Sequence, residues 1–595
     1  MNVSGGLAYH PWQPFARLTF QAMQNAEIAR LLGDVADLLE ISAANPFKVR
    51  AYRNAARTVA DHPDPIAELV TGENYDLTDL PGIGGGIAKE ITALIETGTL
   101  PQRQLLVATV PPGLLELLRI PGLGPKRVKL FHDELKVNSV ADLKQALDAG
   151  KIAKLAGFGP KLLDKIREGV AGAGTAHGRI VLHEAEQYGR ALVEYLKAGG
   201  GTDAIDVAGS FRRRKETIGD LDIVVSCTNP SAVIARFGKF GDVAHVASQG
   251  DTRSTVRLTS GLQVDLRVVE PAAFGAAMQY FTGSQAHNIE LRKVAQAKQL
   301  KLNEYGVYRG SKCIAGRTEV EVYASLGLDW IPPELREGRN EIALARDHQL
   351  PDLVTLEQIR GDLQMHTDAS DGKATMAEMI EAARSLGYAY IAVTDHSPRM
   401  SMAGQTPAEL RAQWKQIDRL NKGLRGFRIL KSVEMDILES GKLDLPDDVL
   451  AEADYVVATI HYGLKQSERQ LTDRLLAAIE SRWVDAIGHP TGRIVPVRPS
   501  YPLDFDVVAK AAANSKCLLE INGSERLDLP DTLAAAAKTH GVRFVLSTDA
   551  HNQRELGFMR FAVAVARRAG LTAADVLNTR TTADFLKGLR RSRNR

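Results

Sequence analysis

From Ile359 to Arg595, short apolar runs alternate with helical stretches, and this alternation constrains the fold more than any other feature. Strands that alternate with helices are typical of a parallel β-sheet with helices packed on its faces. Several runs end in polar residues, as YIAVTDH ends in His396 and VDAIGH ends in His489. Because residues just past the carboxyl ends of parallel strands gather on one face of a barrel, we expect these side chains to meet there.

The polar residues at these strand ends are of the types that bind transition metals. A single histidine in such a place is more often a core or surface residue, but a series of histidines and carboxylates is hard to explain without a cation cluster. Imidazole and carboxylate ligands together suit Zn²⁺, Mn²⁺ or Fe rather than Ca²⁺. Such a cluster can activate water and neutralise a phosphate. The predicted ligands are His366, Asp371, His396, Glu434, His461, His489, Asp549 and His551.

A second stretch, Val207–Val225, reads as a strand, a Gly-Ser turn, a basic loop and another strand. Asp220 and Asp222 lie two residues apart in the second strand, so their side chains point to the same face. Paired carboxylates repel each other unless a cation lies between them, and Mg²⁺ prefers such oxygen ligands together with substrate phosphates. The basic run Arg212–Lys215 would supply cations for phosphate. The alternative is a solvated acidic strand beside a basic loop.

The motifs GSFRR and GDLDI in this stretch resemble the nucleotidyltransferase signature of family X DNA polymerases, the group that includes DNA polymerase beta. Further blocks follow in the family's order: QVDLRV with Asp265, then YFTGS, then NEYG. The resemblance implies that Asp220, Asp222 and Asp265 hold two Mg²⁺ or Mn²⁺ ions and catalyse nucleotide addition to a primer. The nucleotide-binding residues that it implies are Arg179, Gly209, Ser210, Arg213, Gly219, Tyr280, Phe281, Gly283 and Asn288.

Three segments share an apolar-x-Gly-x-Gly core followed by a helix: Leu80–Ile91, Ile120–Phe131 and Leu155–Ile166. They recur at about 35–40 residues, a period typical of repeated supersecondary units. Such a turn exposes backbone N–H groups at a helix start, where the dipole favours an anion. One turn alone is more often a helix cap, but three predict helix-hairpin-helix units that contact the DNA backbone without reading sequence. The predicted contacts are Gly82, Gly84, Gly122, Gly124, Lys126, Gly157, Gly159 and Lys161.

The carboxyl-terminal pattern resembles the polymerase and histidinol phosphatase (PHP) domain, a distorted (β/α)7 barrel with a trinuclear metal site. Fused behind a family X polymerase, as in bacterial enzymes, this domain would act as a 3′–5′ exonuclease that is often Mn²⁺-dependent. The resemblance therefore implies two or three Mn²⁺, Zn²⁺ or Fe ions at the strand-end ligands.

Two positions depart from the patterns of these families. The PHP domain usually opens with His-x-His, but here the first position is Gln364, a neutral and weaker ligand, so one metal position is expected to be loosened. In DNA polymerase beta the first hairpin carries a Schiff-base lysine that removes 5′-deoxyribose phosphate. The aligned position here is Glu90, with Lys89 one residue earlier. One residue turns a helical side chain by about 100°, so lyase activity is not predicted.

Length and composition set the remaining limits. A chain of 595 residues should form several domains, because single cores rarely exceed about 250–300 residues. The net charge of +2 means that any DNA-binding surface is local. Cys227, Cys313 and Cys517 form no CxxC pair, which indicates a reducing cytosol. No apolar run reaches about 18 residues, so neither membrane insertion nor secretion is expected.

We therefore expect a multidomain fold: helix-hairpin-helix domains, an α+β nucleotidyltransferase palm with a thumb, and an α/β PHP barrel. The expected order is an amino-terminal extension (1–24), a helical DNA-binding domain (25–100), a fingers-like helical domain with two hairpin units (101–175), the palm (176–280), a thumb-like domain (281–335), a linker (336–358) and the PHP domain (359–595).

The favoured interpretation is a monomeric cytoplasmic DNA repair polymerase, nucleoid-associated when bound to DNA, with an attached metal-dependent nuclease. Its substrates would be dNTPs and duplex DNA with gaps or recessed ends, and its two catalytic centres would lie on separate cores. One alternative is an untemplated nucleotidyltransferase with an inactive PHP domain, which the three hairpins and YFTGS disfavour. Another is a non-enzymatic DNA-binding scaffold, which the presence of all three palm carboxylates disfavours.

Overall fold

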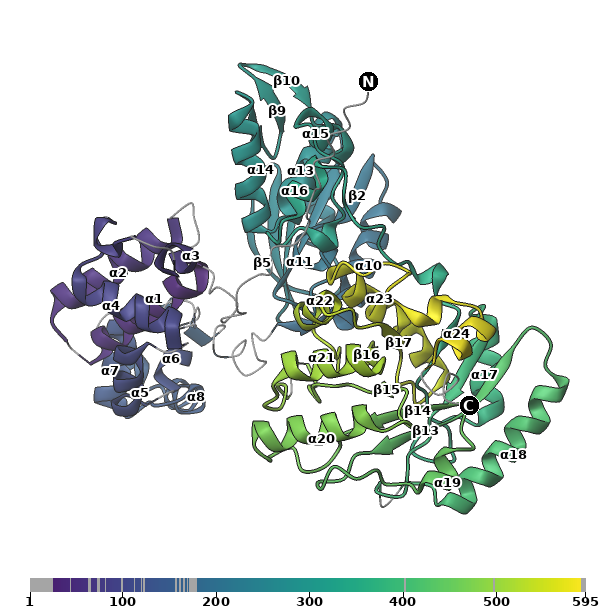
Figure 1. Ribbon diagram of the computed structural model, residues 1–595. Coiled ribbons are helices and arrows are strands. Elements are labelled where there is room, and N and C mark those ends of the chain that lie inside the picture. Colours follow the sequence, from purple (N-terminus) through teal and green to yellow (C-terminus); the bar gives the residue numbers. More distant parts are fainter. Residues whose placement is uncertain are drawn as a thin grey trace, which may run out of the picture. The chain divides into compact units, whose positions relative to one another are not determined.

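The computed structural model describes residues 25–589 with gaps at 43, 62–65, 72–74, 81, 98–99, 112, 119, 121–122, 156–157, 160–161, 164–165, 168–169, 171–178, 401–402 and 496–497. The predicted amino-terminal extension, 1–24, lies outside the described residues. The chain divides into two compact units, Met1–His177 and Gly178–Arg595, and each is described by itself (Figure 1).

The amino-terminal unit is helical. Its described elements are α1 (Asn25–Ile41), α2 (Pro46–Asp61), α3 (Ile66–Thr71), η1 (Leu77–Asp79), α4 (Gly85–Thr97), α5 (Pro101–Thr109), α6 (Gly113–Leu117), α7 (Pro125–Leu135), α8 (Val140–Asp148) and η2 (Ile152–Lys154). One hydrophobic cluster runs from Ile28 in α1 through Ile91 in α4 to Phe131 in α7. Because α1 packs on α2, α5 and α7, the two helical domains predicted for 25–100 and 101–175 share one core.

The second unit begins with a five-stranded palm sheet in the order β2-β4-β7-β6-β5, in which only β4 and β7 are parallel neighbours. Its elements are β1 (Ile180–Val181), α10 (Leu182–Ala198), β2 (Ala204–Val207), α11 (Gly209–Arg212), β3 (Thr217–Ile218), β4 (Asp220–Ser226), α12 (Pro230–Phe237), β5 (Val243–Gln249), β6 (Arg253–Leu258) and β7 (Gln263–Val269). Helix α10 begins at Leu182, since Ile180 and Val181 pair with β3.

The thumb region joins helices to a small antiparallel sheet, β10-β9-β8. Its elements are η3 (Pro271–Ala273), α13 (Phe274–Thr282), α14 (Gln285–Ala297), β8 (Lys301–Asn303), β9 (Gly306–Arg309), β10 (Lys312–Ala315), α15 (Glu319–Ser325), η4 (Pro333–Leu335), α16 (Glu341–Arg346) and η5 (Leu356–Gln358). The segment predicted as a linker, 336–358, is packed: Arg336 and Glu341 are buried, and Glu341 Oε1 lies 2.7 Å from His287 Nδ1.

The carboxyl-terminal domain is built on seven parallel strands in chain order, from β11 to β17. The strands are β11 (Gly361–Asp362), β12 (Tyr390–Val393), β13 (Arg428–Asp436), β14 (Tyr455–Thr459), β15 (Ala486–Ile487), β16 (Leu518–Asn522) and β17 (Phe544–Ser547). A single parallel bridge between Met365 and Ala550 joins the two ends of the sheet. These strands are almost wholly buried, as parallel strands covered by helices must be.

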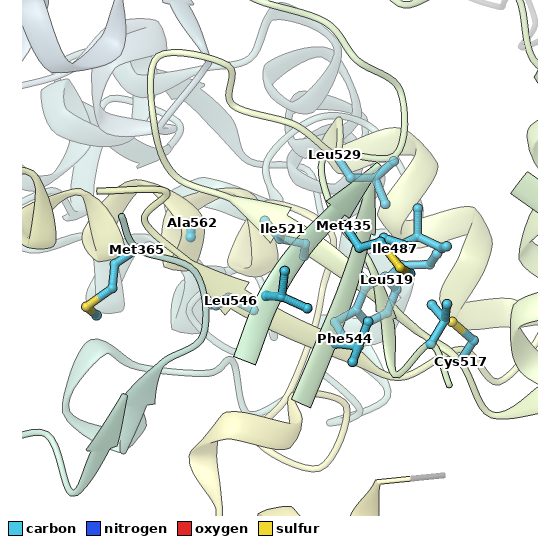
Figure 2. Close-up of a cluster of buried hydrophobic side chains, with 14 of the residues drawn as sticks. Met365, Met435, Ile487, Cys517, Leu519, Ile521, Leu529, Phe544, Leu546 and Ala562 are labelled. Atoms are coloured by element: carbon cyan, nitrogen blue, oxygen red, sulfur yellow. The ribbon is translucent and has the colours of Figure 1, made fainter. Parts of the chain in front are cut away.

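The described helices around the strands are α17 (Met376–Ser385), α18 (Pro407–Gly423), α19 (Asp447–Leu450), α20 (Glu468–Glu480), α21 (Phe505–Ser515), α22 (Asp531–Thr539), η6 (Gln553–Phe558), α23 (Met559–Arg568), η7 (Leu577–Thr579) and α24 (Thr582–Gly588). Local sequence starts several of them, because capping boxes such as Thr375 with Glu378 satisfy the first backbone N–H groups. Figure 2 shows side chains of the buried cluster that results, among them Met435, Ile487 and Leu546.

The palm and the barrel share buried apolar surface. Leu527 and Phe561 of the barrel belong to the palm's hydrophobic cluster, and the Phe561 ring lies 5.6 Å from the ring of His183 in α10. Arg493, on the loop that follows β15, donates from Nη1 to Glu216 Oε2 at 3.1 Å in the palm. The two candidate sites lie on separate hydrophobic clusters, but at this seam apolar side chains from both domains close one of them. Among the described helices, none is both long and apolar enough to cross a membrane.

Candidate active sites

The three palm carboxylates are brought together by strand register. Asp220 and Asp222 alternate on β4, and Asp222 lies directly opposite Asp265 on the parallel strand β7, so all three side chains share one face of the sheet. Burial, followed by the charges of Asp220 and Asp265, raises the pKa of Asp222 to about 7. Asp265 is oriented by Thr255 Oγ1 at 2.5 Å and by Gln263 Nε2 at 2.8 Å. Three converging acids of this kind fit divalent cations.

Gly209 is required by the backbone beside these acids. It has φ of +63°, where side chains are disfavoured, and a Cβ placed there would collide with Asp222 Oδ2. This glycine starts the short helix α11, so the sequence folds the Gly-Ser turn directly against β4, the strand that carries Asp220 and Asp222.

A cleft of about 1030 Å³ opens over the carboxylates. Asp220 and Asp222 line it together with eight of the nine residues predicted to bind nucleotide, namely Arg179, Gly209, Ser210, Arg213, Tyr280, Phe281, Gly283 and Asn288. Gly219 lies just outside, where a Cβ would come within 3.3 Å of Arg179 Nη1. Asp265 is also outside the lining, on β7, the strand next to that of Asp222.

The basic run Arg212–Lys215, which was expected to supply cations for phosphate, is divided between two tasks. Arg213 and Lys215 line the cleft. Arg212 instead donates from Nη1 and Nη2 to the two carboxylate oxygens of Glu319, each at 2.8 Å, and Arg214 donates to Glu186 at 3.1 Å. Alternate residues of this turn point in different directions, so a continuous run of cations cannot all meet one ligand.

The aromatic end of the cleft is fixed by amide hydrogen bonds. Asn288 donates from Nδ2 to the backbone oxygen of Tyr280 at 2.7 Å, and its Oδ1 accepts from Gln279 Nε2 at 2.7 Å. The rings of Tyr280 and Phe281 are nearly perpendicular, with centroids 5.2 Å apart. Both rings line the cleft, so this pair is not simply core.

The barrel brings every predicted strand-end ligand to one face, around the buried carboxylate of Glu434. Glu434 Oε2 lies 3.3 Å from His366 Nε2 and 3.3 Å from His396 Nδ1. Glu434 Oε1 lies 2.9 Å from His489 Nε2 and 3.4 Å from His461 Nε2. A carboxylate with two histidines at each oxygen would hold cations together with those imidazoles.

The remaining ligands complete a second side of this cluster. Asp371 lies 3.4 Å from His366 Nδ1, 3.2 Å from His396 Nε2 and 3.3 Å from His551 Nε2. Asp549 Oδ1 lies 3.1 Å from His366 Nε2. Although burial acts to raise it, hydrogen bonds from His396 and His551 hold the pKa of Asp371 well below its usual range.

The chemistry of the barrel cluster fits metal ions. Candidate groups are His366–Asp371–His396–His551, His396–Glu434–His461 and His366–Glu434–Asp549, whose ligand atoms lie within 4.8 Å of one another. Both ring nitrogens of His366 are buried without a hydrogen-bond partner, as is His396 Nδ1. Buried polar atoms are rarely left in that state unless something else binds them. Gln364 is also buried with both amide atoms unsatisfied, and its backbone oxygen accepts from Asp549 N at 3.0 Å, so its backbone lies beside the cluster.

Two residues at this site were missed in the sequence. Asp436 Oδ2 lies 3.2 Å from His461 Nδ1, and Arg526 Nε lies 3.3 Å from Asp549 Oδ2. Asp436 could have been found, because it follows Glu434 by two residues and therefore points to the same face of β13. Arg526 lies in a loop and carries no such signal.

The hairpin glycines of the amino-terminal unit lie at helix starts as predicted. Gly82 has φ of +83°, and Gly84 and Gly124 accept the first hydrogen bonds of α4 and α7 from Ala88 N and Val128 N. A Cβ at Gly84, Gly124 or Gly159 would meet nothing within 4 Å, so these turns face open space. Lys126 is exposed at the start of α7. Three predicted contacts, Gly122, Gly157 and Lys161, lie outside the described residues.

Glu90, which occupies the position of the lyase lysine, accepts a hydrogen bond from the backbone N–H of Gln102 at 3.0 Å. Lys89 lines a separate cleft of about 700 Å³ with Tyr75. The neighbouring side chains thus point in different directions, as the one-residue shift along the helix predicts.

Four parts of the chain match known families. Residues 23–100 match a helix-hairpin-helix domain, 114–171 a SAM-like helix-hairpin-helix tandem, 277–337 the DNA polymerase beta thumb and 362–522 the PHP domain. Together with the palm carboxylates, they define a polymerase beta-like nucleotidyltransferase fused to a PHP barrel. The fold class predicted from the sequence is confirmed.

The DNA polymerase/3′-5′ exonuclease PolX of Bacillus subtilis is 37% identical to this chain over 576 residues, which are 96% of this chain and 100% of that protein. The chain therefore belongs to the PolX family, the family X DNA polymerases with a carboxyl-terminal PHP domain. Shorter relatives are a probable phosphatase of Thermoanaerobacter sp., 31% identical over 37% of this chain and 89% of that protein, and a probable phosphatase of Acetivibrio thermocellus, 30% identical over 37% of this chain and 90% of that protein.

Proposed function

We propose that this protein is a DNA polymerase that adds deoxynucleotides to the 3′ end of a primer in gapped or recessed duplex DNA, and that it acts as a cytoplasmic monomer. The observation that carries this proposal is the cleft, which has Asp220 and Asp222 at its floor and Arg179, Arg213 and Lys215 in its lining. Two Mg²⁺ or Mn²⁺ ions held by the three palm carboxylates would compensate the triphosphate charge and favour deprotonation of the primer hydroxyl.

The protein's own part in this reaction is positioning and charge compensation. Arg179, Arg213 and the Ser210 hydroxyl bind the triphosphate, since guanidinium groups suit phosphate oxygens. Tyr280 and Phe281 contact the sugar and base, with Asn288 holding the backbone of Tyr280. Gly209 and Gly283 allow the nucleotide to approach the backbone closely.

The test is incorporation of a dNTP into gapped duplex DNA, with and without a template base. Asp222→Ala removes a carboxylate of the cleft, so incorporation should fall to background while the protein stays folded. Asp206→Asn is the matched control, because Asp206 is exposed on the neighbouring strand β2 and should leave incorporation unchanged. Incorporation that survives Asp222→Ala, or that ignores the template, would contradict the proposal.

We propose that the barrel is a metal-dependent 3′–5′ exonuclease whose ligands are the eight predicted histidines and carboxylates, with Glu434 at their centre. Two or three Mn²⁺, Zn²⁺ or Fe ions bound there would supply an activated water and neutralise the scissile phosphate. Arg526 is placed to bind a phosphate oxygen next to Asp549. The amide of Gln364 is a weak ligand, and a stronger ligand at this position would hold one ion more tightly.

The nuclease is tested on 3′-extended and recessed end-labelled DNA. His366→Ala and His461→Ala should abolish digestion and leave nucleotide incorporation mostly intact, because neither side chain lines the polymerase cleft. The control is His540→Ala, which removes a histidine of the same domain that pairs with Asp506 on the surface. Equal loss of both activities in the two ligand variants would argue against two independent centres.

A second candidate activity for the barrel is hydrolysis of phosphate monoesters. It is favoured by the relatives named probable phosphatases, which match over 230 residues, a length close to that of the barrel. Turnover of p-nitrophenyl phosphate, measured beside digestion of end-labelled DNA in Mg²⁺ and in Mn²⁺, separates the two substrate classes.

We propose that the hairpin turns bind the DNA backbone without sequence preference. Their glycines face open space at helix starts, and Lys126 is exposed beside one of them. Lys126→Ala should weaken binding similarly for different sequences and reduce the salt dependence by about one ion. Lys129→Ala is the control on the same helix, because Lys129 is paired with Asp133 at 2.7 Å. Unchanged salt dependence in Lys126→Ala would count against this contact.

A further inference from the structure

The nucleotide cleft is not built from the palm and thumb alone. Asp531, the first residue of α22, and Arg568, the last residue of α23, also line it, and both belong to the PHP barrel. They lie more than 300 residues beyond Arg213 in the chain. The barrel thus forms part of the wall that faces the predicted triphosphate position.

Arg568 is buried and holds three groups from three regions of the unit. Its Nη1 donates to the backbone oxygen of Arg213 at 2.7 Å and to Glu337 Oε1 at 2.9 Å. Its Nη2 donates to Asp531 Oδ2 at 2.9 Å. Because the planar guanidinium binds two fixed carboxylates, it has little freedom to move. The position of the barrel is therefore coupled to that of the basic loop.

Arg213 is held from the thumb side as well. Its Nε donates to Glu337 Oε1 at 3.0 Å, and its Nη1 donates to the backbone oxygen of Thr282. Glu337 therefore accepts from Arg213 and Arg568 with the same oxygen. The side chain of Arg213 is fixed by the thumb, while its backbone is fixed by the barrel.

Cations gather at this junction. Arg213, Lys215 and Arg568 line the cleft beside the carboxylates Glu337 and Asp531, and Arg339 pairs with Asp531 from the exposed side. Burial lowers the pKa of Lys215, with Glu337 acting against that effect, so the ammonium lies in a partly desolvated site. Cations that line a cleft suit a polyanion, and the triphosphate of a dNTP is the polyanion of the proposed reaction.

We propose that Arg568 of the PHP barrel is a positioning residue of the polymerase site, which fixes Arg213 and the adjacent Lys215 against the triphosphate of the incoming dNTP. The inference rests on the nucleotide site proposed above. Lys215 is then a further contact to the triphosphate, and the barrel is needed for nucleotide binding independently of its own metal centre. Small displacements of a positioning group are costly, so loss of Arg568 should weaken dNTP binding by about 10-fold to 100-fold.

The experiment compares Arg568→Ala, Arg568→Lys and Arg567→Ala in the full-length protein. Arg567 is the matched control, since it precedes Arg568 on α23 and crosses the same interface to Glu334 at 2.7 Å, but does not line the cleft. KM for dATP and kcat are measured on duplex DNA with a one-nucleotide gap opposite thymine. Digestion of end-labelled DNA reports whether each variant has kept a folded barrel.

Arg568→Ala should raise KM for dATP at least about 10-fold with a smaller change in kcat. Arg568→Lys should show a smaller rise in KM, because it keeps the positive charge. Arg567→Ala should have the same KM as the wild type. Equal KM in Arg568→Ala and Arg567→Ala would overturn the inference. If Arg568→Ala loses both activities, the KM of Arg568→Lys becomes the test. A raised KM in Arg568→Lys supports the inference, and a wild-type KM in that variant overturns it. Arg213→Ala separates the two proposals, because a wild-type KM in that variant refutes the nucleotide site itself.

Discussion

The junction of palm and thumb depends on one buried carboxylate, and its removal gives a sharp test. Glu319 Oε1 accepts from Arg212 Nη1 at 2.8 Å and from Arg336 Nη1 at 2.7 Å. Its Oε2 accepts from Arg212 Nη2 at 2.8 Å and from Trp330 Nε1 at 3.0 Å. Glu319→Gln keeps the shape but removes the charge, and so leaves Arg336, which is fully buried, without its anion.

The size of the effect follows from the pKa of the carboxyl. Burial alone would raise the pKa of Glu319, but hydrogen bonds and charge from Arg212 and Arg336 lower it from 4.5 to about 2. A decrease of that size corresponds to about 3 kcal/mol of stability. Removing one partner of a buried ion pair costs a similar ~3–5 kcal/mol. We therefore expect the protection of α15 and β8–β10 amides from hydrogen exchange to fall by about 100-fold in Glu319→Gln.

The effect also has a defined pH dependence. Because the folded pKa is depressed, the stabilisation is complete above pH 4.5 and is lost as the pH falls toward 2. Between pH 7 and pH 4 the difference in free energy of unfolding between wild type and Glu319→Gln should narrow by about 1 kcal/mol. Glu321→Gln, on the exposed side of α15, is the control and should not alter protection. The reasoning would be refuted if Glu319→Gln showed the same hydrogen-exchange protection as the wild type. It would also be refuted if the difference in protection between the two proteins widened at low pH.

Three further outcomes are expected from the two centres. Gly209→Ala should lower single-turnover incorporation at least about 100-fold, because its Cβ displaces Asp222. Gly200 has a similar φ, but a Cβ there would meet nothing within 4 Å, so Gly200→Ala should leave incorporation unchanged. Gln364→His should tighten Mn²⁺ binding, measured by calorimetry, about 10-fold, and an unchanged affinity would place Gln364 outside the metal site. Removing metal by chelation should lower the melting temperature of the barrel, and Mn²⁺ should restore it in the wild type but not in His366→Ala.

The palm and the PHP barrel are in direct contact. Arg493 lies on the loop that follows His489, and it pairs with Glu216, which lines the polymerase cleft. Leu527 and Phe561 close the palm's hydrophobic cluster from the barrel side. The barrel is therefore a structural part of the polymerase as well as a separate catalytic domain.

Local sequence determined much of the two sites. The two-residue period of a strand places Asp220 and Asp222 on one face, and parallel strands bring their carboxyl ends to one edge, so the barrel ligands could be found from where each apolar run stops. The Gly-x-Gly turns could be found because a glycine at a helix start has a recognisable neighbourhood. These features depend on dihedral angles and periodicities within a few residues, which the sequence carries directly.

Only the tertiary structure decided which distant groups complete the sites. Nothing near Arg213 in the sequence indicates Glu337, Asp531 or Arg568, and the shared core of palm and barrel follows from apolar residues that look like ordinary core. The division of the basic run between Arg212 and Arg213 was likewise set by a partner, Glu319, more than 100 residues away. Contacts of this kind arise from how whole domains pack, and packing joins residues whose separation along the chain gives no local signal.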